Sequence, residues 1–195
     1  MKKISAVLFA LILTLSSLPM AAAEEETVQQ IIEPTSHILV VYFSATGTTR
    51  GVAEKLAEGL SADLYEIVPE EPYTDADLNW NDSRSRTSIE TDDPSCRPAI
   101  AGELPDLAPW DTVFIGYPIW WGDTPRIVSN FVEQADLTGK TLAVFFTSGS
   151  SGLGNSMKHL EQQSEAGTWL EGRRFTSRTT AEELVNWARS LGIEP

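Results

Sequence analysis

The sequence predicts an α/β domain, in which a doubly wound parallel β-sheet carries helices on both faces. Apolar segments of strand length alternate along the chain with amphipathic helical patterns, which is the order expected of such a sheet. Three of these segments end in short loops rich in Gly, Ser, Thr or Trp: residues 44–49 (the first loop), 117–123 (the second loop) and 147–154 (the third loop). Ligands of open parallel sheets bind beyond the carboxyl ends of the strands, so these loops are the candidate site.

The first strand, first loop and first helix follow one another without a gap. Residues 38–43 are apolar, and Val52, Leu56 and Leu60 recur at helical spacing after the loop. The N–H groups of a first helical turn have no partners within the helix, and the helix dipole favours negative charge there. Gly47 permits close approach of the backbone. The first loop therefore predicts an anion site suited to a phosphate group.

Further strands are predicted at 63–67, 112–116 and 141–146, with a weaker one at 168–172. Helices are predicted from Pro125 onward, around 156–164 and at 180–191. We expect Asp123 or Thr124 to cap the first of these, with Pro125 at its first position. Thr180 and Glu183 have the spacing of a capping box at the start of the last helix.

Residues 70–107, here called the insertion, form a long irregular region that contains several prolines. A loop of this length inside a compact domain is either functional or disordered. Its apolar residues, including Tyr73 and Trp80, indicate that it packs on something, with room for a short helix. Arg84 and Arg86 either contact a substrate or partner, or form surface ion pairs.

The N-terminus predicts export of the protein. Lys2 and Lys3 precede the apolar run 6–15, and small residues at 21–23 suit a signal peptidase, so residues 1–23 are interpreted as a signal peptide. The alternative is an uncleaved N-terminal anchor. Residues 24–36 are predicted to form an acidic linker, and 37–195 the folded domain. After cleavage we expect no stable membrane insertion and a periplasmic, cell-surface or extracellular location.

Composition excludes several classes of function. The 195 residues contain 28 Asp and Glu but 14 Lys and Arg, a formal charge of −14. Such a charge disfavours nucleic acid and anionic lipid, and it either suits a basic protein partner or simply maintains solubility. The single Cys96 excludes an internal disulfide and a multi-cysteine metal cluster. His37 and His159 are not arranged as a metal site.

The three loops together indicate a mononucleotide with a flat ring system. The first loop lacks the Gly-Lys-Ser/Thr ending of a Walker loop, and no Gly-x-Gly-x-x-Gly follows the first strand. The Gly149–Gly152 segment does not have the spacing of a nucleophile elbow. Trp120 and Trp121 either fill the edge of the core or stack on a planar ligand, and their place beside the phosphate loop favours stacking.

These motifs resemble those of flavodoxins. The run Ser44-x-Thr46-Gly47-x-Thr49 is similar to the flavodoxin phosphate-binding loop. The run Tyr117-Pro-Ile-Trp-Trp-Gly122, followed by Asp-Thr-Pro, resembles the second flavin loop of short flavodoxin-like proteins, including exported bacterial ones. The insertion between Tyr73 and Pro98 also looks like that group. The resemblance covers about residues 37–193.

The resemblance implies five parallel strands in the order 2-1-3-4-5 and one noncovalent FMN. It implies that the phosphate is held without a lysine, that the second loop flanks the isoalloxazine, and that the third loop approaches its pyrimidine side. The aromatic residue usual in the third loop is missing, so one flavin face is left open or covered by Trp80, Tyr73 or another part of the insertion. The implied cofactor-binding residues are Ser44, Thr46, Gly47, Thr48, Thr49, Pro118, Ile119, Trp120, Trp121, Gly122, Ser148, Gly149, Ser150 and Gly152.

Three functions remain open from the sequence. The first is an electron carrier outside the cytoplasm that docks a redox protein partner on its acidic surface. The second is an FMN-dependent NAD(P)H reductase of quinone-like or nitro substrates, which an open flavin face would favour. The third is a flavin-free binding module that keeps only the fold. No catalytic side chain is predicted, because the flavin itself carries the electrons.

Overall fold

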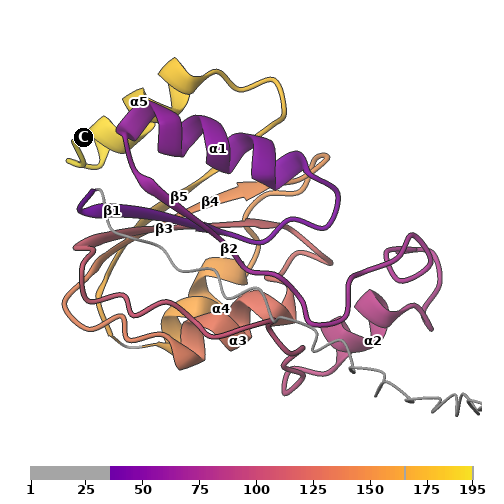
Figure 1. Cartoon of the computed structure of the whole chain (residues 1–195). Coiled ribbons are helices and arrows are strands. Elements are labelled where there is room, and N and C mark those ends of the chain that lie inside the picture. Colours follow the sequence, from indigo (N-terminus) through magenta and orange to yellow (C-terminus); the bar gives the residue numbers. More distant parts are fainter. Residues whose placement is uncertain (1–35, 165, 195) are drawn as a thin grey trace, which may run out of the picture.

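The computed structural model describes residues 36–164 and 166–194, so the predicted signal peptide and nearly all of the predicted linker lie outside the described residues. A five-stranded sheet forms the centre of the domain, with the order β2-β1-β3-β4-β5 and every neighbouring pair parallel (Figure 1). This confirms the predicted fold class and strand order. The strands are β1 (Ile38–Tyr42), β2 (Asp63–Glu66), β3 (Thr112–Pro118), β4 (Thr141–Thr147) and β5 (Thr168–Phe175).

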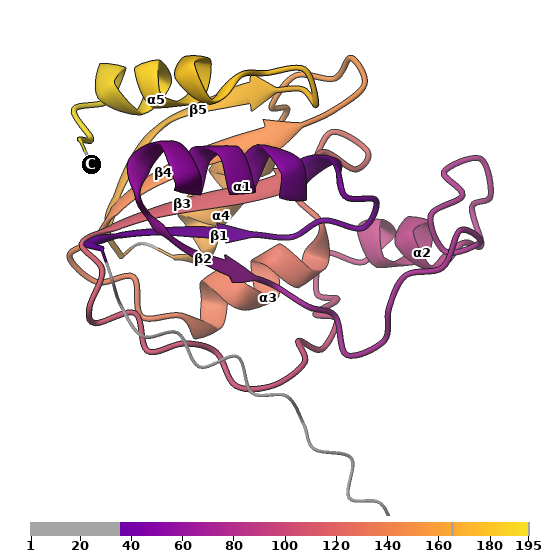
Figure 2. The same ribbon diagram turned by 45° about the horizontal axis from the view of Figure 1, so that its top comes forward.

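Helices cover both faces of the sheet. Figure 1 shows α1 and α5 on one face and α3 and α4 on the other, while α2 lies outside these layers. In Figure 2 the strands point toward the side of the molecule on which α2 lies, so the insertion stands near their carboxyl ends. The helices are α1 (Thr48–Leu60), α2 (Arg86–Asp92), α3 (Arg126–Gln134), α4 (Ser156–Gln163) and α5 (Ala181–Ser190).

Two apolar cores explain why β1 is apolar along its whole length. Successive side chains of a strand point to opposite faces of the sheet. Val40 accordingly packs in the core beneath α1 and α5, with Leu56 and Leu184. Val41 packs in the core beneath α3 and α4, with Phe131 and Leu160. A strand buried on both faces therefore reads as a continuous apolar run.

The insertion is folded rather than disordered. The Thr87 hydroxyl donates to the Asp77 carbonyl at 2.6 Å, and the Ser85 hydroxyl caps the short helix α2 by accepting from the Ser88 N–H. Arg97 anchors the insertion to α3 through a two-pronged ion pair with Glu133.

Most element boundaries agree with the predictions, and two differ. The capping box of α5 is confirmed in both directions, but β5 extends to Phe175 rather than 172. The predicted start of α3 is wrong by one position, because Pro125 is its N-cap and no side chain caps it. The Thr124 hydroxyl donates instead to the Ser156 carbonyl at 3.2 Å, and Asp123 is engaged with other groups. Among the described residues, no helix is both long and apolar enough to cross a membrane.

Candidate functional site

The first loop presents an uncapped helix terminus. Gly47 is the N-cap of α1, with φ of 84°, and no side chain caps the helix. The N–H groups of the first turn are thus left for a ligand, as expected of an anion site. Thr49 is buried, and its hydroxyl is hydrogen-bonded to that of Thr147 at 2.8 Å. This bond joins the first loop to the end of β4 and thereby fixes one corner of the site.

The second loop contains a tight turn, in which two consecutive residues have positive φ. Trp120 and Asp123 are joined by two backbone hydrogen bonds of 3.1 and 2.8 Å, and between them Trp121 has φ of 48° and Gly122 has φ of 77°. Two consecutive positive φ values are characteristic of a type I′ turn. The turn pushes the Trp121 side chain outward, where 47% of its surface is exposed.

Trp120 and Trp121 therefore have different environments, although they are adjacent in the sequence. Trp120 is half-buried and makes edge contacts with Phe43 and Tyr73, with ring centroids 5.5 and 5.4 Å apart. Trp120 thus packs at the edge of the core, which is one of the two sequence interpretations, and it also lines the cleft described below. Its stacking on a planar ligand stays a prediction.

A polar cluster supports the second loop from behind. The Asp123 carboxylate accepts a hydrogen bond from the Thr124 N–H at 2.8 Å. It also forms an ion pair with Arg126 at 3.2 Å and contacts Nδ1 of His159 at 2.8 Å. The buried Arg126 also donates to the carbonyls at the end of α2, including that of Thr91 at 2.8 Å. The cluster thus connects the second loop, the insertion and α4.

The third loop is held by a residue that the sequence analysis did not single out. Arg174 of β5 donates to the carbonyls of Ser148 and Gly149, at 3.0 and 2.7 Å. The Ser148 hydroxyl donates to the Ser151 carbonyl within the loop. Further on, a side chain at Gly154 would collide with the Gly122 carbonyl, so the second and third loops approach each other through backbone atoms.

Tyr117 is buried beneath these two loops. Its hydroxyl donates to the Ser156 hydroxyl at 3.2 Å, and Ser156 in turn donates to the Leu153 carbonyl at 2.7 Å. Burial raises the pKa of Tyr117 to about 12, so the phenol stays protonated at neutral pH. We therefore assign Tyr117 a supporting role beneath the site rather than a role as a titrating group.

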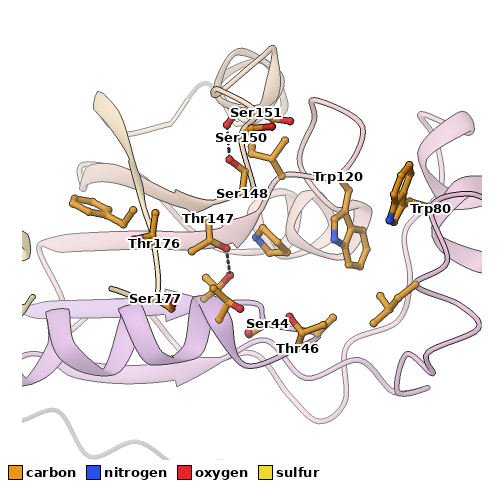
Figure 3. Close-up of a pocket in the computed structure, with 18 of the residues that line it drawn as sticks. Ser44, Thr46, Trp80, Trp120, Thr147, Ser148, Ser150, Ser151, Thr176 and Ser177 are labelled. Carbon is orange, nitrogen blue, oxygen red and sulfur yellow. Dashed lines mark hydrogen bonds between the residues drawn. The ribbon is translucent and has the colours of Figure 1, made fainter. Parts of the chain in front are cut away.

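One cleft of about 1030 Å³ brings the three loops together. Figure 3 shows Ser44 and Thr46 on one wall, Ser148 and Ser150 on another, and Trp120 and Trp80 toward one end. The cleft includes eleven of the predicted residues, whereas Gly47, Gly122 and Gly152 belong to the loops without lining it. The eleven are Ser44, Thr46, Thr48, Thr49, Pro118, Ile119, Trp120, Trp121, Ser148, Gly149 and Ser150.

The insertion contributes to the cleft through Leu78, Trp80 and Thr87. Of the two aromatic residues suggested as covers, Trp80 lines the cleft and is 73% exposed. Tyr73 instead lies behind Trp120, where its hydroxyl donates to Glu90 and the Arg86 guanidinium stacks on its ring. Arg86 also pairs with Glu90 at 2.6 Å, so of its two interpretations the ion pair is the one observed.

The loop between β5 and α5 was missed as part of the cleft. The cleft is lined by Phe175, the last residue of β5, and by Thr176, Ser177 and Arg178 of the loop. The strand is three residues longer than predicted, and the loop begins at the same sheet edge as the others. The rule that the carboxyl ends of parallel strands share an edge would have found it. Within the described residues, no cluster of His, Cys, Asp and Glu could hold a metal ion.

Comparison with known proteins agrees with this architecture. The family model for flavodoxin matches residues 37–191. The chain belongs to the flavodoxin family. A search of curated proteins gave no significant match.

Two solved structures resemble this flavodoxin-family chain at high identity. A candidate flavoprotein from Bacteroides eggerthii is 47% identical, with a TM-score of 0.76, over 80% of this chain and 98% of its own. One from Bacteroides uniformis is 43% identical, with a TM-score of 0.75, over 78% and 97%. A flavoprotein from Lactobacillus acidophilus, solved in complex with FMN, is 22% identical with a TM-score of 0.62, covers 77% and 97%, and shares the fold.

Proposed function

We propose that this flavodoxin-family chain binds one FMN noncovalently in the cleft and acts as an electron carrier. The observation that supports the proposal most strongly is a single cleft that joins an uncapped helix terminus to an aromatic wall. The first requirement of a mononucleotide is a place for its phosphate, and the second is a flat apolar surface for its ring. The cleft offers both, at the sheet edge where ligands of such folds bind.

The chain's own residues bind and orient the cofactor in this proposal. The first loop would hold the phosphate through backbone N–H groups and the hydroxyls of Ser44, Thr46 and Thr48. Trp120 and Trp121 would flank the ring, and the third loop would meet its polar rim. FMN supplies the electron-transfer chemistry when it is bound, and the protein sets the environment of the ring.

Retention of flavin tests FMN binding. The purified protein is loaded with excess FMN or excess riboflavin, desalted, and the retained flavin is measured from its visible absorbance. We expect about one FMN per chain and much less riboflavin, because riboflavin lacks the phosphate that the first loop would hold. Retention of neither flavin, or equal retention of both, would contradict the proposal.

The carrier role is favoured by the charge of the molecule. A formal charge of −14 would steer a basic redox protein toward this surface. Such steering is screened by salt, with a Debye length of about 10 Å at 0.1 M. Electron transfer from the reduced protein to a basic acceptor such as cytochrome c should therefore slow markedly as salt is raised, whereas transfer to a small neutral acceptor should not.

A second candidate is a flavin-dependent reductase, favoured by the exposed Trp80. A large aromatic ring that is 73% exposed on the cleft could receive a second flat molecule, such as a quinone or nitro compound. Oxidation of NAD(P)H by the FMN-loaded protein, accelerated by quinone, would identify this activity. If NAD(P)H is not oxidised and electron transfer to the basic protein depends on salt, the carrier role is the supported one.

We also propose that the protein works outside the cytoplasm. The support is the charge and hydropathy pattern of residues 1–23, which lie outside the described structure. The mass of the protein recovered from a bacterial host tests this. We expect a periplasmic or secreted chain that begins near Glu24, whereas a full-length chain in the membrane fraction would indicate the uncleaved anchor.

A further inference from the structure

The loop between β5 and α5 brings a basic side chain to the cleft of an acidic protein. Arg178 lines the cleft together with Ser44, Thr46 and Thr48 of the first loop and α1. We propose that Arg178 is a specificity residue that distinguishes a phosphorylated flavin from an unphosphorylated one. This inference rests on the proposed binding of FMN and adds a charged residue to the phosphate end of the site.

The position of Arg178 is set by α1, the helix whose N-terminus faces the cleft. The Lys55 ammonium on α1 donates to the carbonyls of Ser177 and Thr179, at 3.1 and 3.0 Å. Within the loop, the Thr176 N–H donates to the Thr179 hydroxyl at 3.0 Å, and the Arg178 N–H donates to the Thr176 hydroxyl at 3.3 Å. These bonds hold the backbone on both sides of Arg178 against α1.

The loop lies at the phosphate end of the cleft. In Figure 3, Ser177 lies beside α1, and Thr176 and Ser177 are on the other side of Ser44 and Thr46 from Trp80. A ligand whose ring reaches Trp120 and Trp80 would therefore extend its tail past the first loop toward Arg178. Trp80 and the loop that carries Arg178 thus lie on opposite sides of the first loop, as the two ends of a flavin mononucleotide require.

Arg178 is available for a ligand, whereas Arg50 and Arg174 are engaged with other groups. Arg50, in the first turn of α1, pairs with Glu66 through one guanidinium nitrogen that donates to both carboxylate oxygens. Arg174 donates to the carbonyls of the third loop. Among residues 36–164 and 166–194, no ion pair involves Arg178, and its side chain is exposed.

A guanidinium group adds a positive charge, which the first loop lacks. Backbone N–H groups and hydroxyls recognise phosphate oxygens but carry no net charge, and the chain as a whole has a formal charge of −14 that opposes an anionic ligand. The planar fork of arginine donors matches the geometry of a phosphate, and such charge-assisted bonds are stronger than neutral ones. Riboflavin carries the same ring but no phosphate, so it gains nothing from Arg178.

The test compares FMN and riboflavin affinities in Arg178→Gln, Arg178→Lys and wild type. Loss of one charge-assisted bond at an exposed site predicts about a tenfold weaker FMN affinity in Arg178→Gln. Riboflavin affinity should be unchanged, and Arg178→Lys should recover much of the FMN affinity. The salt dependence of FMN binding should also be shallower in Arg178→Gln than in wild type.

Arg189→Gln is the matched control, because it removes one positive charge from α5 at an exposed ion pair with Glu194. It should leave both affinities unchanged, which separates a local contact from a change in net charge. The inference is overturned if Arg178→Gln binds FMN as wild type does, or if it weakens both flavins equally. If wild type itself does not bind FMN, the proposed function fails as well, so the two failures are distinguishable.

Discussion

At the scale of single residues, Trp121 is held in a conformation that its side chain disfavours. A residue other than glycine in the left-handed region costs about 1–2 kcal/mol, and Asn and Gly are the residues that type I′ turns favour. The half-exposed ring gains little from burial in return. Such backbone strain is concentrated at functional sites, so we infer that Trp121 contacts the ligand.

Replacing Trp121 with Asn tests this inference. We expect Trp121→Asn to stabilise the flavin-free protein by about 1 kcal/mol, because the turn no longer holds a bulky residue at positive φ. The same variant should bind FMN more weakly, because an aromatic contact is lost. Chemical denaturation and FMN titration measure the two effects, with Trp121→Phe as the control that keeps an aromatic ring. A variant that binds FMN as tightly as wild type would show that Trp121 does not contact the flavin.

Sequence reasoning at this scale identified residue types better than residue pairs. The hydroxyls and the glycine of the first loop and the two tryptophans were found because they follow apolar strands. The bond between Thr49 and Thr147 joins residues 98 positions apart, so no local pattern could indicate it. The cluster of Asp123, Arg126 and His159 was missed for the same reason, because it depends on how α3 and α4 pack.

At the scale of elements, the insertion is an integral wall of the cleft. It contributes Trp80, and the donation from Arg126 to the end of α2 ties it to the second loop. The apolar residues of this region indicated that it packs against the rest of the domain. The hydrogen-bond partners of its many polar residues could not be identified from the sequence. The length of β5 was underestimated because this exposed edge strand contains Gly172 and two arginines, which do not read as a buried strand.

Trp80→Ala tests the contribution of the insertion. Because Trp80 is largely exposed, we expect the free energy of unfolding of the flavin-free protein to change little. The affinity for FMN should fall by about 1 kcal/mol, the usual worth of an aromatic contact. Titration by quenching of flavin fluorescence measures it. Ile89→Ala is the matched control, since Ile89 is an exposed apolar residue of the same insertion outside the cleft. Equal affinities in Trp80→Ala and wild type would remove the insertion from the flavin contacts.

At the scale of the whole molecule, the fold followed from the sequence because local and long-range preferences agree. The apolar strands β1, β3 and β4 are each followed by a helix of the correct period, so the parallel sheet was predictable from the residues. Its strand order followed from the flavodoxin resemblance. The cleft is a consequence of that order, because it opens where the loops after β1, β3, β4 and β5 meet. The shape of the cleft was not predictable, because it depends on side chains from separate elements.

The central claim is that one FMN lies across the first, second and third loops. Backbone amide NMR of the isotope-labelled protein, recorded before and after addition of one equivalent of FMN, tests it most directly. We predict that the largest changes occur at the amides of residues 46–50, 120–123 and 148–152, and that helices distant from the cleft are little affected. Changes confined to another surface, or an unchanged spectrum, would contradict the account.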